Sequence, residues 1–338
     1  MRHINIPVFI PHLGCPNNCV FCNQRSISGH GDFDMKSVRG ELERAVSTID
    51  YESCEVEIAF FGGSFTGIDR GDMVYLLSLA KEFIDAGKAQ SVRLSTRPDY
   101  IDREILDILK ACKVTDIELG LQSMDDNVLR LSKRGHTADC ARSACGLIKE
   151  YGFNLIGQMM IGLPGSDTQN EVMTAKEIAK LCDGARIYPT VVFEDTELCA
   201  MTRSGEYKPL TTDEAVERSE RALDVFIKAG KPVIRLGLCA SDNLSDPGKA
   251  VAGATHSALG ELVYAEHYMR VIREYINEHK ICLAGKDVVI RAPRGETSKV
   301  VGQKRKNKLR LIESGAKSVR VIEDDRLDKY RVVVEVSE

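Results

Sequence analysis

The 338-residue chain lacks the features that would place it at once among membrane, secreted or nucleic-acid-coating proteins. Lys and Arg number 46 against 50 Asp and Glu, so no excess of one charge demands a nucleic-acid or membrane partner. The longest apolar run, around 154–163, contains Gln158 and ends at Pro164, well short of the roughly 20 residues that a membrane span requires. The first residues lack the apolar segment and small-residue cleavage site of a secretory signal. We therefore expect a cytoplasmic protein without a membrane partner.

The eleven cysteines do not form the pattern of a disulfide framework. Their number is odd, the chain is long, and eight of them lie singly along segments that look helical or extended. We interpret these eight as reduced thiols. The other three, Cys15, Cys19 and Cys22, fall within eight residues of one another, which points to a shared chemical role.

Short apolar runs alternate with amphipathic helical patterns from residue 2 to about residue 237. Strands are predicted at 4–10, 56–61, 91–95, 115–121, 154–161, 185–192 and 232–238, and helices near 35–50, 70–87, 102–112, 125–150, 168–182 and 211–230. Such alternation favours a parallel sheet, and six or more repeats favour a barrel over a short doubly wound sheet. We predict an α/β fold in which residues 1–240 form a partial (βα)6-type TIM-like barrel.

The pattern changes after the predicted barrel. Residues 241–285 are predicted to form a connecting loop and a helix from Glu261 to His279, followed by a small β-α-β-β module over 286–338. In this module the strands are expected at 287–292, 318–323 and 330–336, and one helix at 298–314. The module carries fourteen Lys and Arg against nine Asp and Glu, a net charge of +5. Its basic residues are concentrated at Lys304, Arg305, Lys306, Lys308 and Arg310.

The three clustered cysteines have the spacing C-x3-C-x2-C and directly follow the first predicted strand. Soft thiolates select zinc, copper(I) or iron–sulfur clusters. A structural zinc site needs four ligands, and no regularly spaced fourth ligand follows, although zinc stays open as the alternative. Three thiolates on a 4Fe-4S cluster leave one iron free to bind another molecule. The spacing therefore favours a 4Fe-4S cluster held by Cys15, Cys19 and Cys22.

These cysteines, the aromatic Phe21 before the last of them and the Gly62-Gly63 turn after the second strand resemble the radical S-adenosylmethionine (SAM) superfamily. Over about residues 5–240 the chain is similar to the radical domain of the Elongator catalytic subunit. That similarity rests on five motifs in the same order: 60–66 (FFGGSFT), 96–100 (TRPDY), 118–123 (ELGLQS), 133–137 (KRGHT) and 159–165 (MMIGLPG).

The resemblance implies the cofactors and their chemistry. In that family the free iron of the 4Fe-4S cluster binds the amino and carboxylate groups of S-adenosylmethionine. An electron donor such as flavodoxin or ferredoxin reduces the cluster, and the 5′-deoxyadenosyl radical that forms removes a hydrogen atom from the substrate. The chain is accordingly expected to be a radical SAM enzyme whose barrel encloses the reactive radical.

The resemblance also implies SAM contacts by position. Gly62 and Gly63 would let the backbone approach the methionine amino group, Arg134 would pair with the methionine carboxylate, and Gln122 would bond the ribose or methionine. Gly162 and its neighbours would line the adenine. Some of these motifs are also similar to coproporphyrinogen III dehydrogenase, which has acidic residues at the positions of Ser95 and Gln158. The full set of predicted cofactor contacts is Phe21, Gly62, Gly63, Ser64, Ser95, Gln122, Arg134, Gln158 and Gly162. Each has a structural alternative, as a turn glycine, a solvated charge or a core residue.

The substrate is inferred from the C-terminal module. The Elongator enzyme carries an acetyltransferase domain, and the residues after the barrel are too few for it, so acetyl transfer is not expected. The basic segment that begins near Gly302 could bind phosphates, similar to a KH-like clamp without its second glycine, which favours RNA (tRNA or rRNA) modification. Two alternatives stay open: a radical SAM enzyme acting on a small molecule or peptide, and a non-enzymatic, metal-stabilised RNA-binding protein.

Two further residues are candidates for catalysis. Cys239 follows the last predicted strand and could donate a hydrogen atom, while His256 in the next loop could act as an acid or base. Single cysteines and histidines are more often structural, so both keep that alternative.

Overall fold

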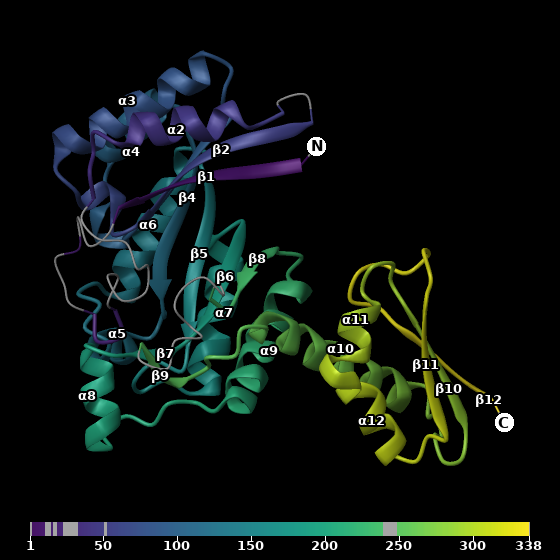
Figure 1. Ribbon diagram of the computed structural model, residues 1–338. Helices are drawn as coiled ribbons and strands as arrows, with labels where there is room; N and C mark the ends of the chain where they lie inside the picture. The colour runs from purple at the N-terminus through teal and green to yellow at the C-terminus, as the bar shows by residue number, and fades with distance from the viewer. Residues whose placement is uncertain are drawn as a thin grey trace.

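Seven parallel strands curl into a half-barrel (Figure 1). The computed structural model describes residues 2–10, 15, 19–22, 33–50, 53–238 and 249–337. The sheet order is β1-β2-β3-β4-β5-β6-β8, and every neighbouring pair is parallel. The strands are β1 (Arg2–Ile10), β2 (Cys54–Gly62), β3 (Ser91–Thr96), β4 (Val114–Gln122), β5 (Asn154–Ile161), β6 (Gly184–Pro189) and β8 (Val233–Leu236). The predicted partial TIM-like barrel is confirmed.

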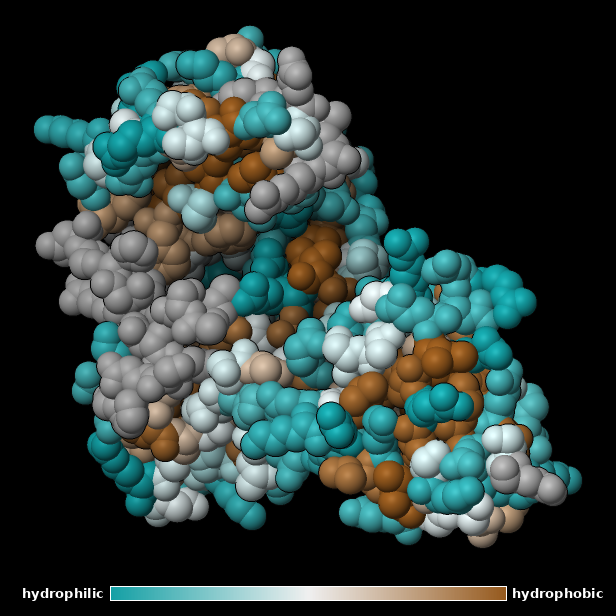
Figure 2. Space-filling view, turned by 45° about the vertical axis from the view of Figure 1, so that its right-hand side comes forward, coloured by the Kyte–Doolittle hydropathy of each residue, from teal (hydrophilic) through white to brown (hydrophobic). Residues whose placement is uncertain are grey.

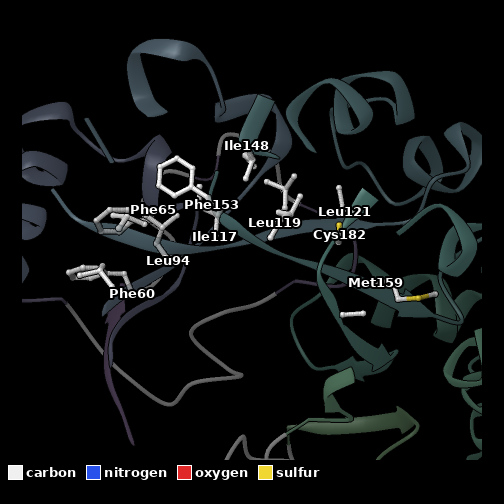
Figure 3. Packing of buried hydrophobic residues seen from close by; sticks show 14 of the residues in the cluster. Phe60, Phe65, Leu94, Ile117, Leu119, Leu121, Ile148, Phe153, Met159 and Cys182 are labelled. Carbon is white, nitrogen blue, oxygen red and sulfur yellow. The ribbon is translucent and has the colours of Figure 1, made fainter. Parts of the chain in front are cut away.

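Helices cover the outer face of this sheet (Figure 1). They are α2 (Val38–Ser47), α3 (Arg70–Asp85), α4 (Arg103–Ala111), α6 (Ala138–Glu150), α7 (Thr168–Leu181) and α9 (Thr212–Lys228). Two shorter helices are α5 (Asp126–Leu131) and α8 (Glu197–Ser204), of which α8 packs on Val20 and Val192 in a separate small cluster. The core lies between the two layers. Figure 3 shows Leu94 and Ile117 from neighbouring strands close to Phe65, and Ile148 of α6 belongs to the same buried cluster. Burial of these side chains supplies the main driving force for the barrel.

Polar side chains fix where the helices begin. Each helix from α3 to α9 is preceded by an Asp or Thr whose side chain accepts a hydrogen bond from a backbone N–H of the first turn. Asp167 and Thr211 form full capping boxes with Asn170 and Glu214. In a parallel α/β barrel these helix starts lie at the carboxyl ends of the strands, which we call the mouth of the half-barrel.

Several predicted elements are divided. The predicted helix 125–150 is two helices, because Lys133 and Gly135 have the left-handed φ values +52° and +78°. The predicted strand 185–192 splits into β6 and β7 (Val191–Phe193). β7 pairs antiparallel with β9 (Ala250–Gly253), which was not predicted, nor was α8.

The C-terminal module is a three-stranded sheet covered by helices (Figure 1). Its elements are β10 (Asp287–Ala292), α11 (Thr297–Val301), the 3-10 turn η3 (Gln303–Arg305), α12 (Lys306–Glu313), β11 (Ser318–Glu323) and β12 (Val333–Ser337). Strand β10 lies in the middle, parallel to β11 and antiparallel to β12. The single helix predicted over 298–314 is wrong in detail, since Gly302, with φ +76°, separates α11 from α12.

Helix α10 (Leu259–Glu278) belongs to both parts of the molecule. Leu259 and Val263 are buried in the barrel core, whereas Tyr268 and Ile272 are buried in the core of the module. The predicted divisions at residues 240 and 285 stay predictions. Within the described ranges, no helix combines the length and apolarity needed to cross a membrane.

Candidate active site

The ends of β1 and β2 meet closely at the mouth. The N–H of Gly63 donates to the carbonyl of Ile10 at 2.8 Å, and Gly62 has φ +114°. A Cβ on Gly62 would lie 2.5 Å from the Ile10 oxygen, inside van der Waals contact. Only glycine fits this backbone path, so the Gly-Gly pair holds the chain that leads into the cysteine segment against β2.

Hydroxyl groups connect the next two strand ends. Ser64 is buried, and its Oγ lies 3.1 Å from Thr96 Oγ1 and accepts a hydrogen bond from the N–H of Arg97 at 3.2 Å. Thr66 Oγ1 lies 2.6 Å from the same Thr96 hydroxyl. The segments after β2 and β3 are therefore fixed relative to one another.

Two arginines surround the thiol of Cys19. Arg134 Nη1 lies 3.2 Å and Arg97 Nη1 4.0 Å from Cys19 Sγ, and all three residues are buried. Arg134 Nη2 also donates to the carbonyl of Gly120 at 2.6 Å, and Arg97 is held by a bidentate pair with Asp99 at 2.9 Å. The two guanidinium groups thus place positive charge beside a sulfur atom of the predicted ligand set.

Cys15 and Cys22 complete the predicted set of cluster ligands. Desolvation by neighbouring groups raises the pKa of the Cys15 thiol, although the residue is exposed; a hydrogen bond from the Ser64 backbone and the charges of Arg97 and Arg134 act in the opposite direction. The N–H of Cys22 donates to the carbonyl of Cys19 at 3.0 Å. Within the described part of the chain, no three Cys, His, Asp or Glu side chains gather as a metal-binding group. The soft donors and flanking guanidinium groups fit an iron–sulfur cluster, and the three cysteine assignments stay predictions.

Gln122 has the features of a ligand contact. It ends β4 at a register shift and has a left-handed backbone with φ +65°. Its Oε1 is buried and accepts no hydrogen bond from the residues that the structure describes. A buried acceptor without a donor is costly, and a strained backbone often marks a functional position. The residue therefore fits the predicted contact to an N–H or O–H group of SAM.

A network of charged side chains fills the interior of the half-barrel; we call it the inner network. Arg93 bonds Glu57 at 2.7 Å, Asp116 at 3.0 Å and Glu118 at 3.2 Å. Arg186 bonds Glu118 at 2.6 Å. The sequence interpretation missed these residues, although each alternates along its strand with side chains of the outer core, which is the signal of an inward-facing position.

Ser95 and Gln158 join this network. Gln158 Nε2 donates to Glu118 at 2.7 Å and to Ser95 Oγ at 3.4 Å. The neutral side chains at these two predicted cofactor positions are therefore oriented by a carboxylate one strand away, on Glu118.

The loop after β5 lies over a cavity of about 290 Å³. Gly162, with φ +82°, donates its N–H to Glu171 at 2.7 Å and accepts from the Tyr207 hydroxyl at 2.6 Å. Burial raises the pKa of Tyr207 to about 12. Arg218 Nε bonds Glu171 at 2.8 Å, which fixes the far wall of the cavity. The hydrogen bonds to Glu171 and Tyr207 thus fix the position of the Gly162 loop, which is the segment predicted to line the adenine.

The remaining predicted residues have varied surroundings. Half-buried Phe21 packs on the small cluster that contains Val20 and Leu198. His256 accepts a hydrogen bond from the N–H of Ala258 at 3.1 Å at the start of α10, a local structural role. Cys239 lies outside the described residues. The five basic residues of the module differ: Lys306 pairs with Asp213 and Arg310 with Glu266, whereas Lys304, Arg305 and Lys308 have no such pair in the described ranges.

Comparison with known proteins identifies the class. Residues 9–178 match the model of the Radical SAM superfamily, and residues 182–271 match the Radical SAM C-terminal domain. The chain therefore belongs to the radical SAM superfamily. Like the other members it is an enzyme, and the family uses a 4Fe-4S cluster and S-adenosylmethionine. This excludes the non-enzymatic alternative.

The curated relatives give a more particular likeness. The chain is 27% identical over 293 residues to tRNA uridine(34) acetyltransferase of Methanocaldococcus jannaschii, covering 74% of this chain and 53% of the relative. It is 25% identical over 255 residues to Elongator complex protein 3 of Saccharomyces cerevisiae, covering 63% and 46%. The chain thus spans about half the length of these relatives.

Solved structures support the fold. Elp3 of the archaeon Methanocaldococcus infernus, with an N-terminal deletion, has a TM-score of 0.59 at 23% identity, covering 83% of this chain and 64% of that chain. Coproporphyrinogen III oxidase of Escherichia coli has a TM-score of 0.50 at 17% identity, covering 68% and 53%. The predicted resemblance to the Elongator radical domain is confirmed.

Proposed function

We propose that this radical SAM enzyme modifies RNA, with tRNA or rRNA as its substrate. The observation that carries the radical chemistry is the buried Cys19 thiol between two guanidinium groups. The Gly62 contact lies at the same mouth, as does the Gln122 oxygen that accepts no hydrogen bond from the described residues. An RNA substrate is supported by the relatives named as tRNA uridine(34) acetyltransferases and by the basic C-terminal module.

The residues of the mouth have distinct tasks in this proposal. Cys15, Cys19 and Cys22 bind the cluster, and Gln122 and Arg134 bind SAM. When bound and reduced by an electron donor such as flavodoxin or ferredoxin, these cofactors would supply hydrogen-atom abstraction by a 5′-deoxyadenosyl radical. We place this reaction in the cytoplasm.

In this proposal the inner network closes the interior of the half-barrel beneath the mouth. Arg93 and Arg186 form ion pairs with Glu57, Asp116 and Glu118, so each of these three carboxylates has a cationic partner. The side chains of the inner network fill the interior of the half-barrel next to the mouth, where the cofactors are predicted to bind. A reactive carbon radical needs an enclosure of this kind, which excludes water.

The radical chemistry is tested by Cys19→Ala. The variant should lose iron, sulfide and 5′-deoxyadenosine formation together, because one of three cluster ligands is removed, while its urea unfolding stays close to that of the wild type. Cys140→Ala, which removes a half-buried thiol of α6, is the matched control and should keep all three properties. Full 5′-deoxyadenosine formation by Cys19→Ala would refute the ligand assignment.

The RNA substrate requires a separate measurement. Mass spectrometry of nucleosides from digested tRNA and rRNA should reveal a modification present in cells with the gene and absent from cells without it. Identical nucleosides in the two strains would instead favour the small-molecule or peptide alternative.

A further inference from the structure

The turn between α11 and α12 has an unusual backbone. Gly302, Lys304 and Arg305 have φ values of +76°, +52° and +63°. Two successive side-chain-bearing residues in the left-handed region are unfavourable, because the Cβ crowds the following carbonyl. We call residues 302–305 the basic turn. Its shape holds two long cationic side chains, Lys304 and Arg305, in an exposed position.

The charges of this region divide into two groups. Lys306 pairs with Asp213 of α9 at 3.4 Å, and Arg310 pairs with Glu266 of α10 at 2.6 Å. In the ranges that the structure describes, Lys304, Arg305 and Lys308 form no ion pair. The first group attaches the module to the rest of the protein, and the second is available to an external anion.

An apolar strip continues from the basic turn along α12. Leu309 and Ile312 are three residues apart on α12, which places them on one face of the helix, and they are 51% and 42% exposed. Apolar side chains also reach the surface among hydrophilic ones on the module, which forms a separate lobe (Figure 2). Cations beside apolar side chains match a single strand, whose phosphates and unstacked bases are both accessible. In a duplex the faces of the bases are stacked on one another and are not accessible to such side chains.

The position of the basic turn relative to the mouth is fixed. Asp213 lies in the first turn of α9, and Arg218 of the same helix lines the cavity behind the Gly162 loop. Asn307, buried directly after the basic turn, donates to the carbonyl of Ala265 on α10 at 2.8 Å. The basic turn is therefore held at the end of the barrel where the predicted SAM contacts lie.

We infer that the basic turn and the exposed face of α12 form a docking surface for single-stranded RNA. Lys304, Arg305 and Lys308 bind phosphates, and Leu309 and Ile312 contact bases. A strand bound there lies beside the mouth, so that a neighbouring nucleotide can enter the half-barrel. The inference rests on the proposed function for the choice of RNA as the substrate.

The test measures binding of a fluorescein-labelled 15-nucleotide single-stranded RNA of mixed sequence by fluorescence anisotropy, using the full chain over a series of KCl concentrations. Loss of two phosphate contacts by K304Q/R305Q should flatten the slope of log K against log [salt] by about 1.4, which at 0.1 M salt weakens binding about 25-fold. K317Q/R320Q removes two exposed charges from the β11 side of the module and should bind within about twofold of the wild type, because these residues are outside the docking surface. Leu309→Ser should weaken binding without changing the slope, since it removes no charge.

Three results would overturn the inference. One is equal RNA affinity of K304Q/R305Q and K317Q/R320Q; another is no binding of the oligonucleotide by the wild type. The third is binding of an acidic flavodoxin that depends on Lys304 and Arg305 while RNA does not bind, which would make the basic turn a protein-docking surface. Wild-type 5′-deoxyadenosine formation without RNA, measured on the same preparation, reports separately on the radical chemistry.

Discussion

Replacing Gly62 with alanine should damage both the stability and the chemistry of this enzyme. Gly62 has φ +114°, and its Cβ would lie 2.5 Å from the oxygen and 2.8 Å from the carbon of the Ile10 carbonyl. Non-bonded heavy atoms prefer a separation of about 3.5 Å. The ends of β1 and β2 must therefore move apart by about 1 Å to accept the new methyl group.

The structure sets the size of both effects. A disfavoured backbone conformation costs about 1–3 kcal/mol, and forced overpacking costs a similar amount, so we expect the free energy of unfolding to fall by about 3 kcal/mol. The same displacement shifts Gly63 and Ser64 relative to the cysteine segment. A misplacement of about 1 Å can reduce a rate about 100-fold, and we expect that loss in 5′-deoxyadenosine formation.

Two assays check this prediction: urea unfolding followed by circular dichroism, and chromatography of 5′-deoxyadenosine from anaerobically reconstituted enzyme. Gly146→Ala is the matched control, because a Cβ there meets no atom within 4 Å and the residue lies inside α6. It should raise the free energy of unfolding by about 1 kcal/mol and leave the rate unchanged. The reasoning fails if Gly62→Ala unfolds within about 0.5 kcal/mol of the wild type and keeps its rate.

Two further predictions concern charge. Arg93→Met removes the arginine partner of the buried carboxylate of Glu57 and of the half-buried carboxylate of Asp116, and it should lower the free energy of unfolding by about 3–5 kcal/mol. Arg142→Met, on the surface, should cost less than about 1 kcal/mol, and equal urea midpoints of the two variants would contradict the inner network. Burial, aided by the charge of Arg134, lowers the pKa of His136 from 6.5 to about 4. The unfolded chain therefore binds a proton that the native state does not, so this contribution to stability is fully present above pH 6.5 and falls by about 3 kcal/mol as the pH drops to 4. His136→Leu should lose less stability over this interval in urea unfolding at several pH values, and an unchanged pH dependence would count against the burial argument.

The sequence predicted the barrel because the strands have clear patterns. Runs such as 56–61 and 115–121 are bounded by glycines or polar residues, and the helices between them begin at capping residues such as Asp69 and Asp102. The divided elements could not be predicted in the same way. Lys133 and Lys304 adopt left-handed conformations that tertiary contacts impose, and lysine itself gives no signal of such a turn.

The candidate site was predictable only where motifs mark it. Cysteine spacing and paired glycines can be read from the sequence, but the contact of Arg134 with Cys19 joins residues 115 positions apart. The three-way bonding of Glu118 likewise depends on the register of β3, β4, β5 and β6. Such partners emerge only when the strands are brought side by side.

Helix α10 passes unbroken from one hydrophobic core into the other, so the rotation of this helix about its axis sets the orientation of the module relative to the half-barrel. An α-helix advances about 100° per residue, so a single amino acid inserted between Val263 and Tyr268 would swing everything after it by more than a quarter turn. Lys304 and Lys308 of the docking surface would then point away from the mouth of the half-barrel, although the charges themselves had not changed. Any chimera that exchanges this appendage must therefore preserve the phase of the helix as well as its length.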